Sequence, residues 1–169
     1  MAFAYYKKLS KANQAIYRKS DRIELVPIVD VELLYIKVTS LRQALEAEDR
    51  RLTEKMASEI INAIATSISA PHLAVRVLSS RPSNDSEELH GLYEPVDKGK
   101  KARITAWMRT AKHKNVVAFR SFLRTLLHEL CHHIDYELFL FEDSFHTEGF
   151  FKREAHMFRQ LLNEEKKPD

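Results

Sequence analysis

The sequence contains few of the residues that cross-link a chain or interrupt regular structure. Its 169 residues include one cysteine, three glycines and five prolines. The single cysteine, Cys131, excludes an internal disulfide, and the low glycine and proline content favours a helix-rich fold with few long loops. No apolar run approaches the roughly 20 residues of a membrane-spanning helix, and the opening residues lack the apolar run of a signal peptide. We therefore expect a cytoplasmic protein with no membrane segment.

Length and composition are those of a globular protein with one domain. Hydrophobic residues make up 44% of the chain and charged residues 30%, so 169 residues can bury a sizeable core. We predict an α+β fold in a single domain over residues 1–169. A helical N-terminal part is expected at 1–70, followed at 71–163 by a small sheet and two further helices. No sequence feature indicates the oligomeric state.

The basic residues are unevenly distributed, although the net charge is only +3. Residues 98–124 contain nine lysines and arginines and no acidic residue, and a second basic stretch lies near the N-terminus. A face of this kind either contacts DNA or an acidic partner, or is a solvated surface. No base-reading motif accompanies it.

The expected elements of the N-terminal part follow from the spacing of apolar residues. Residues 3–18 are expected to form a short helix, and residues 22–29 an extended connection. Asp30 is expected to cap a helix whose apolar residues repeat at spacings of four and three up to Leu45. The charged stretch 46–51 either breaks this helix or belongs to one long helix, and the apolar stripe that follows ends at Pro71.

After Pro71 the apolar period changes from that of a helix to that of a strand. Alternation predicts strands at 73–78 and 102–108, and a further strand is expected to begin at 90–93. A helix is then expected at 117–137, a connection at 139–149 and a last helix at 150–163. Small strands followed by helices indicate an α+β fold with a sheet of about three strands.

The helix at 117–137 contains the one motif that indicates a chemical function. Residues 128–132 read His-Glu-Leu-Cys-His, the H-E-x-x-H pattern. His128 and His132 lie one helical turn apart, so both rings can reach one metal ion. Glu129 can then reach a water on that ion without binding the ion itself. The competing interpretation is a pair of partly buried structural histidines. It is weakened by the apolar stripe along this helix, which predicts that the motif lies on a core-packed element.

The order of these elements resembles the SprT-like branch of zincin metallopeptidases, which includes the DNA–protein crosslink protease Spartan. The resemblance covers roughly residues 55–160 and rests on a short sheet, the H-E-x-x-H helix and a following His146-Thr147-Glu148-Gly149-Phe150-Phe151 segment. It implies a minimal zincin-like domain, with His128, His132 and His146 as zinc ligands and Glu129 as general base. Thr147 stands where the family usually has glycine. The chain contains no C-x-x-C pair, and therefore lacks the zinc ribbon found in many members.

The third zinc ligand has alternatives. Glu154 lies at a distance from His132 similar to that in glutamate-liganded zincins, and Glu148 is a further candidate. If Glu154 is not a ligand, it is expected to hold a ligand ring or pair with Arg153 or Lys152. The resemblance also implies that the strand around 103–108 is an edge strand that holds a peptide substrate through main-chain hydrogen bonds.

Several neighbours of the motif are candidates for additional site residues. Asp135 shares the face of the two histidines and either orients a ligand ring or is a surface or capping carboxylate. His133 is expected to point away from the metal, and Cys131 is expected to pack in the core. Tyr136 is a candidate for oxyanion stabilisation.

These features predict a zinc-dependent metallopeptidase that hydrolyses peptide bonds of a protein or peptide substrate. The cofactor is Zn²⁺, and the expected catalytic residue is Glu129. The alternative is a DNA- or protein-binding module on a zincin fold with little or no proteolysis, in which the stretch 98–124 contacts DNA. A structural zinc site with four protein ligands is a third possibility.

Overall fold

The computed structural model describes residues 2–82 and 90–164. These residues form an α+β fold of five α-helices, two 3-10 helices and one three-stranded sheet. The strands are β1 (Ala74–Ser80), β2 (Gly91–Glu94) and β3 (Arg103–Arg109), in the spatial order β1-β3-β2. β1 runs parallel to β3, whereas β2 runs antiparallel to it. All three strands match sequence-based predictions to within two residues.

The prediction that the strand around 103–108 is an edge strand is wrong, because β3 is paired on both sides. Its neighbours are β1, where Val77 pairs with Ala106, and β2, where Gly91 pairs with the same alanine. A strand flanked in this way has no row of main-chain groups to offer a peptide. Next to the H-E-x-x-H helix, the edge of the sheet is β2.

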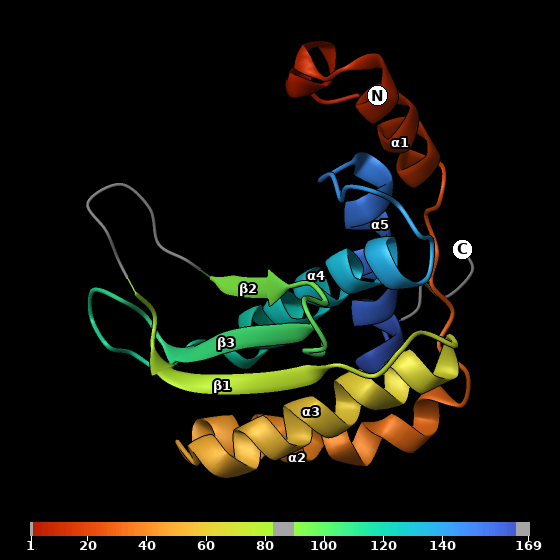
Figure 1. Ribbon diagram of the computed structural model, residues 1–169. Helices are drawn as coiled ribbons and strands as arrows, with labels where there is room; N and C mark the ends of the chain where they lie inside the picture. Colours follow the sequence, from red (N-terminus) through yellow and green to blue (C-terminus); the bar gives the residue numbers. More distant parts are fainter. Residues whose placement is uncertain (1, 83–89, 165–169) are drawn as a thin grey trace.

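One face of the sheet carries the core. Because side chains alternate along a strand, Val77, Ile104 and Met108 share a face, and all three are buried. That face packs on α3 (Arg50–Ser67), which contacts β1, and on α4 (Phe119–Glu137), which contacts β2 and β3. The apolar stripe of α4 is fully buried, with Leu123, Leu126, Leu127, Leu130 and Ile134 at 0% exposure. The candidate metal-binding helix is therefore seated in the core (Figure 1).

The helices of the N-terminal part differ from prediction at their boundaries. α2 (Tyr35–Glu46) and α3 are separate helices, so the charged stretch 46–51 is a break. Asp49 caps α3 by accepting a hydrogen bond from the backbone N–H of Leu52 at 3.0 Å. Asp30 precedes the 3-10 helix η2 (Val31–Leu34) in a left-handed conformation, with φ 53°. The predicted Asp30 cap is therefore wrong, since a capping residue needs an extended backbone to turn its carboxylate onto the helix, and within the described residues this carboxylate makes no capping bond.

The N-terminal arm, residues 2–21, stands apart from the sheet. It comprises the 3-10 helix η1 (Ala4–Lys8) and α1 (Lys11–Asp21), where the sequence predicts one short helix at 3–18. It projects above α5 (Glu148–Leu161), the last helix, as Figure 1 shows. α5 begins two residues earlier than predicted because Thr147 caps it by accepting from the backbone N–H of Phe150.

Each helix among the described residues is too short or too polar to span a bilayer.

Candidate metal centre

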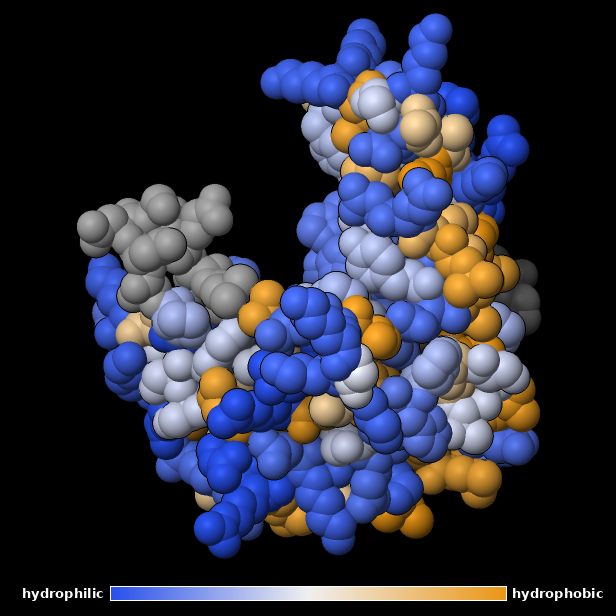
Figure 2. Space-filling model, in the orientation of Figure 1, coloured by the Kyte–Doolittle hydropathy of each residue, from blue (hydrophilic) through white to orange (hydrophobic). Residues whose placement is uncertain are grey.

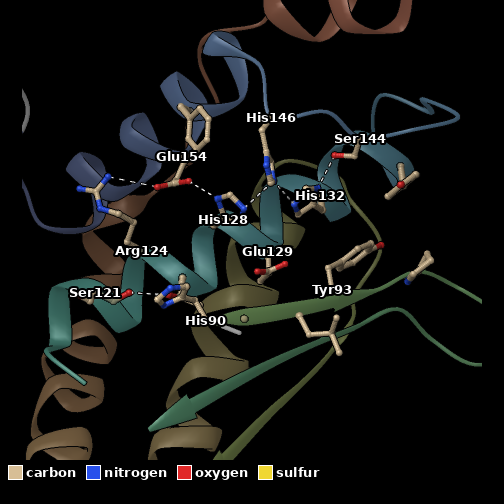
Figure 3. A pocket seen from close by; sticks show the side chains of 16 residues that line it. His90, Tyr93, Ser121, Arg124, His128, Glu129, His132, Ser144, His146 and Glu154 are labelled. Atoms are coloured by element: carbon tan, nitrogen blue, oxygen red, sulfur yellow. Dashed lines mark hydrogen bonds and ion pairs between the residues drawn. The ribbon is translucent and has the colours of Figure 1, made fainter. Parts of the chain in front are cut away.

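Three histidine rings converge in a cavity beside α4 (Figure 3). His128 and His132 project from consecutive turns of α4, and His146 comes from the connection to α5. The Nε2 atom of His146 lies 3.1 Å from Nε2 of His128 and 3.1 Å from Nε2 of His132. Two nitrogens bound tetrahedrally to zinc at about 2.0–2.1 Å are about 3.3 Å apart. The spacing of the three rings therefore fits one zinc ion.

Hydrogen bonds at the other ring nitrogens fix the tautomers of two of these rings. His128 Nδ1 donates to Glu154 Oε2 at 2.8 Å, and a carboxylate can only accept. His132 Nδ1 donates to Ser144 Oγ at 2.7 Å, because the serine hydroxyl donates its own proton to Asp135 Oδ2 at 2.6 Å. Each ring therefore carries its proton on Nδ1 and turns the lone pair of Nε2 inward. Lone pairs that face one another repel, and a shared cation removes that repulsion.

Burial keeps the converging rings in the form that binds metals. Desolvation, together with the neighbouring His128 and His146, lowers the pKa of His132 to about 3. Burial, followed by the charge of His128, also lowers the pKa of His146. Neutral imidazole is the metal-binding form. Both rings are therefore neutral at physiological pH.

Glu129 lies on the wall of the same cavity, next to the edge strand. A Cβ atom added to Gly91 of β2 would lie 2.7 Å from Glu129 Oε1, so only glycine allows this approach. Burial raises the pKa of Glu129, His128 opposes the shift and Glu154 adds to it. A carboxyl group with a raised pKa is suited to exchange protons near neutral pH.

The cavity has a volume of about 750 Å³ and opens between β2, α4 and α5. Figure 2 shows the hollow between the sheet and the N-terminal arm. Besides the three histidines, Glu129 and Glu154, it is lined by residues of β2 and its flanks, of α4, and of the loop and helix that follow: His90, Gly91, Leu92, Tyr93, Pro95, Ser121, Arg124, Thr125, Tyr136, Ser144 and Phe151. Its size is that of a site for a small molecule or a few residues of a peptide.

The two alternative third ligands lie outside the group of converging ring nitrogens. Glu154 is buried behind His128, with one oxygen on that ring and the other 3.5 Å from Arg124. Glu148, in the first turn of α5, is 3.2 Å from Lys152. Among residues 2–82 and 90–164, the group of donors close enough to hold one ion consists of His128, His132 and His146.

Asp135 is fully buried and reaches His132 through Ser144. The sequence indicated Asp135 as a residue that could orient a ligand ring, but it did not indicate Ser144. Its other oxygen accepts from Arg153 at 2.8 Å. Burial raises the pKa of Asp135 to about 6, while Arg153 and the Ser144 hydroxyl hold it down. Asp135 is therefore ionised at neutral pH and can orient the serine. A serine in a loop belongs to no spacing pattern, so no sequence signal could have identified Ser144.

The remaining candidates near the motif have other contacts. His133 is buried, and its Nδ1 accepts from the Tyr93 hydroxyl at 3.0 Å while Nε2 donates to the carbonyl of Pro71 at 2.7 Å. Cys131 is buried in the core, and burial raises the pKa of its thiol. The Tyr136 hydroxyl donates to Asp143 Oδ1 at 3.3 Å, and its ring lines the cavity.

The N-terminal arm holds the backbone of His146, a role that the sequence did not indicate. The Tyr5 hydroxyl donates to the carbonyl oxygen of His146 at 2.8 Å. Burial raises the pKa of Tyr5 to about 12, so this donor keeps its proton. At Gly149 an added Cβ would lie 2.4 Å from the carbonyl oxygen of Asp21. Gly149 therefore allows the end of α1 to sit directly on the start of α5.

No family model matches the chain, and no match was found among curated proteins or among solved structures. The case for a metal centre therefore rests on the positions of these side chains.

Proposed function

We propose that the protein is a zinc-dependent metallopeptidase of the zincin type, similar to the SprT-like branch. The observation that carries this proposal is the meeting of three Nε2 atoms within reach of one ion, beside Glu129 and an open strand edge. His128, His132 and His146 would hold the zinc. Three protein ligands leave the fourth position of a tetrahedral zinc for chemistry.

When bound, zinc supplies a Lewis acid that polarises a substrate carbonyl and activates water at neutral pH. A carboxylate oxygen of Glu129 accepts the proton of the attacking water, and Glu129 then passes this proton to the departing amine. The raised pKa of Glu129 makes its carboxylate a stronger base for the first transfer, and the carboxyl group formed in that step then gives the proton to the amine. Glu154 and Ser144 keep the two helix-borne rings in their tautomers throughout.

The strand β2 gives the substrate a place to bind. One side of β2 pairs with β3, and its other side is unpaired among the described strands. Gly91, Leu92 and Tyr93 of this strand line the cavity. An extended peptide that adds to such an edge is held by main-chain hydrogen bonds, which accept many sequences. β2 would therefore take the role that the family resemblance implies for the strand around 103–108.

The test is to separate zinc binding from hydrolysis. Glu129→Gln should retain about one zinc per chain and lose about 100- to 10,000-fold in the turnover of an unfolded protein such as reduced casein. Zinc is measured by elemental analysis and turnover by the release of new amino termini. Glu137→Gln, on the same helix but not on the cavity wall, is the matched control. Normal turnover by Glu129→Gln would remove this residue from the mechanism.

A second candidate function is the binding of DNA. The nine basic residues of 98–124 lie at the two ends of β3, in the turns next to it and in the first turns of α4. Arg103, Arg109 and Arg120 are each paired with a glutamate. The observation that favours this function is on the N-terminal arm, where these residues are exposed: Lys7, Lys8, Lys11, Arg18 and Lys19. Duplex and single-stranded DNA titrated at increasing salt would test it, and an affinity that salt leaves unchanged would exclude phosphate contacts.

A further inference from the structure

The cavity is chemically different at its two ends. At the end of the cavity near the C-terminus of α4, the rings of Tyr93 and Tyr136 stack with centroids 6.0 Å apart. At the other end lie Ser121, Arg124 and Thr125, near the N-terminus of the same helix. Among the described residues that line the cavity, Arg124 is the only lysine or arginine. One end of the cavity is therefore aromatic, and the other is polar and cationic.

The Arg124 guanidinium is fixed in place without being enclosed. It lies over the Phe158 ring, with its central carbon 4.2 Å from the ring centroid. Its Nη1 atom is 3.5 Å from Glu154 Oε1, and the side chain remains 49% exposed. Stacking on an aromatic ring holds the plane of a guanidinium while leaving its edge open. This edge can therefore bind a ligand without reorganising the side chain.

The Glu154 contact does not use up the hydrogen-bonding capacity of Arg124. Glu154 gives its short hydrogen bond of 2.8 Å to His128 and only the longer 3.5 Å contact to Arg124. A guanidinium has five N–H donors in a fork that matches a carboxylate. Ser121, in the first turn of α4, adds a hydroxyl in the region where the helix dipole favours negative charge.

The distance to the metal centre suits a substrate group close to the cleaved bond. A single carboxylate, that of Glu154, separates the guanidinium from the His128 ring (Figure 3). An extended peptide advances about 3.3 Å per residue. A carboxylate one or two residues from the reacting carbonyl would therefore reach Arg124.

We infer that Arg124 binds a substrate carboxylate within two residues of the cleaved bond and so determines specificity. This inference rests on the proposed peptidase function. The carboxylate comes either from an aspartate or glutamate side chain or from the free C-terminus of a peptide. In the first case the enzyme cuts next to acidic residues, and in the second it trims chain ends.

The experiment begins with sites chosen by the protein itself. Reduced β-casein is digested, and the new termini are identified by mass spectrometry. Sequences that are cleaved are synthesised as matched peptides, with glutamate, glutamine or lysine at each of the two positions on either side of the bond. Each peptide is made with a free and with an amidated C-terminus. kcat and KM are measured separately for the wild type, Arg124→Gln, Arg124→Glu and Arg120→Gln.

Arg120 is the matched control, because it lies on the same helix and also stacks on Phe158, at 4.9 Å, but does not line the cavity. The wild type and Arg120→Gln should prefer the carboxylate peptide by at least about tenfold in kcat/KM, the effect of losing one charged hydrogen-bonded pair. Arg124→Gln should reduce the preference to about twofold or less, and Arg124→Glu should favour lysine at that position. A preference for glutamate over glutamine that persists in amidated peptides shows that a side-chain carboxylate is used. A preference that amidation abolishes shows that the free C-terminus is used.

A purely structural Arg124, which only holds Glu154, would lower kcat for every peptide alike and leave the preference intact. That result would overturn the inference, as would a wild type without preference at any of the four positions. If Arg124→Gln does not fold, Arg124→Lys keeps the positive charge without the guanidinium fork and should show a weaker preference. An undiminished preference in Arg124→Lys, with kcat lowered alike for every peptide, would overturn the inference.

Binding separates failure of this inference from failure of the proposed function. Fluorescein-labelled peptides of the same sequences are titrated onto zinc-loaded Glu129→Gln, with and without Arg124→Gln. At least about tenfold tighter binding of the carboxylate peptide, lost with Arg124→Gln, would support the inference even if the wild type hydrolyses nothing. Equal binding of the glutamate and glutamine peptides would overturn it.

Discussion

The candidate metal centre joins two regions that are built in different ways. His128 and His132 belong to α4, whose opposite side is buried in the core. His146 lies in the connection between α4 and α5, is exposed, and is held from outside by the N-terminal arm. The spacing of the first two depends on one helical turn, whereas the position of the third depends on a contact between residues 141 positions apart.

Mutations in the two regions should therefore affect stability and metal affinity differently. Damage to α4 reaches the core, because its stripe of leucines packs against the sheet and α3. Damage to the arm or the connection leaves that core in place and moves only His146. Metal affinity and stability should therefore change together in the first region and separately in the second.

The largest effect is expected where the two regions are joined. Arg153 of α5 is fully buried and donates to Asp135 of α4 and to the carbonyl oxygens of Ser20, in the arm, and Ile23, just after it. Arg153→Met should lower the free energy of unfolding by about 3–5 kcal/mol, because Asp135 is left as a buried unpaired charge. Urea denaturation measures this change.

The neighbouring Lys152 provides the control for this pair. It contacts Glu24 at 2.8 Å, but both side chains are about half exposed, at 45% and 52%. Lys152→Met should cost less than about 1 kcal/mol. Similar losses for Lys152→Met and Arg153→Met would show that the buried pair does not join the two regions.

Removal of a ligand is expected to have the next largest effect. His132→Ala and His146→Ala should each weaken zinc binding by more than about 100-fold. Loss of a group that only orients a ligand weakens metal binding by at most about 100-fold. Glu154→Ala should fall within that range, at about 10- to 100-fold. Competition with a chromophoric chelator measures the three affinities. Retention of zinc by His146→Ala together with its loss in Glu154→Ala would reverse the assignment of the third ligand.

The Asp135–Ser144–His132 chain tests the support of a ring on the helix. Ser144→Ala removes the acceptor for His132 Nδ1 and should weaken zinc binding by about 10- to 100-fold. Ser144→Thr keeps the hydroxyl and should bind zinc almost as the wild type does. Chelator competition is combined with thermal melting of the metal-free protein. Equal zinc affinity in both variants would show that the hydroxyl does not orient the ring.

The smallest effect is expected at the arm. Tyr5→Phe removes one hydrogen bond to the His146 carbonyl, worth about 0.5–1.5 kcal/mol, and should weaken zinc binding by about two- to tenfold. Tyr6 lies on the same 3-10 helix, but its hydroxyl accepts a hydrogen bond from Arg18. Tyr6→Phe should therefore leave the zinc affinity unchanged. An affinity loss shared by both variants would mean that the arm acts through its overall packing rather than through Tyr5.

The elements that the sequence predicted well are those with strong local patterns. The stripe from Phe122 to Ile134 predicted a core-packed helix over 117–137, and α4 spans Phe119–Glu137. Alternation located β1, of which one face is buried, and also β3, although its central residues are buried on both faces. The predictions that failed concern the path of the chain between elements. At Asp30, residue type favoured a cap, but the left-handed backbone set by the surrounding fold decided otherwise.

The sequence by itself determined α4 and the pairing of His128 and His132 on it, with Glu129 next to the first of them, because residues four apart on a helix are neighbours whatever the rest of the chain does. Only the tertiary structure decided that β2 rather than β3 forms the sheet edge, that Ser144 and Asp135 hold one ring, and that Tyr5 holds the backbone of His146. These contacts join separate elements of the chain. Their geometry depends on how whole elements pack, which no local spacing encodes.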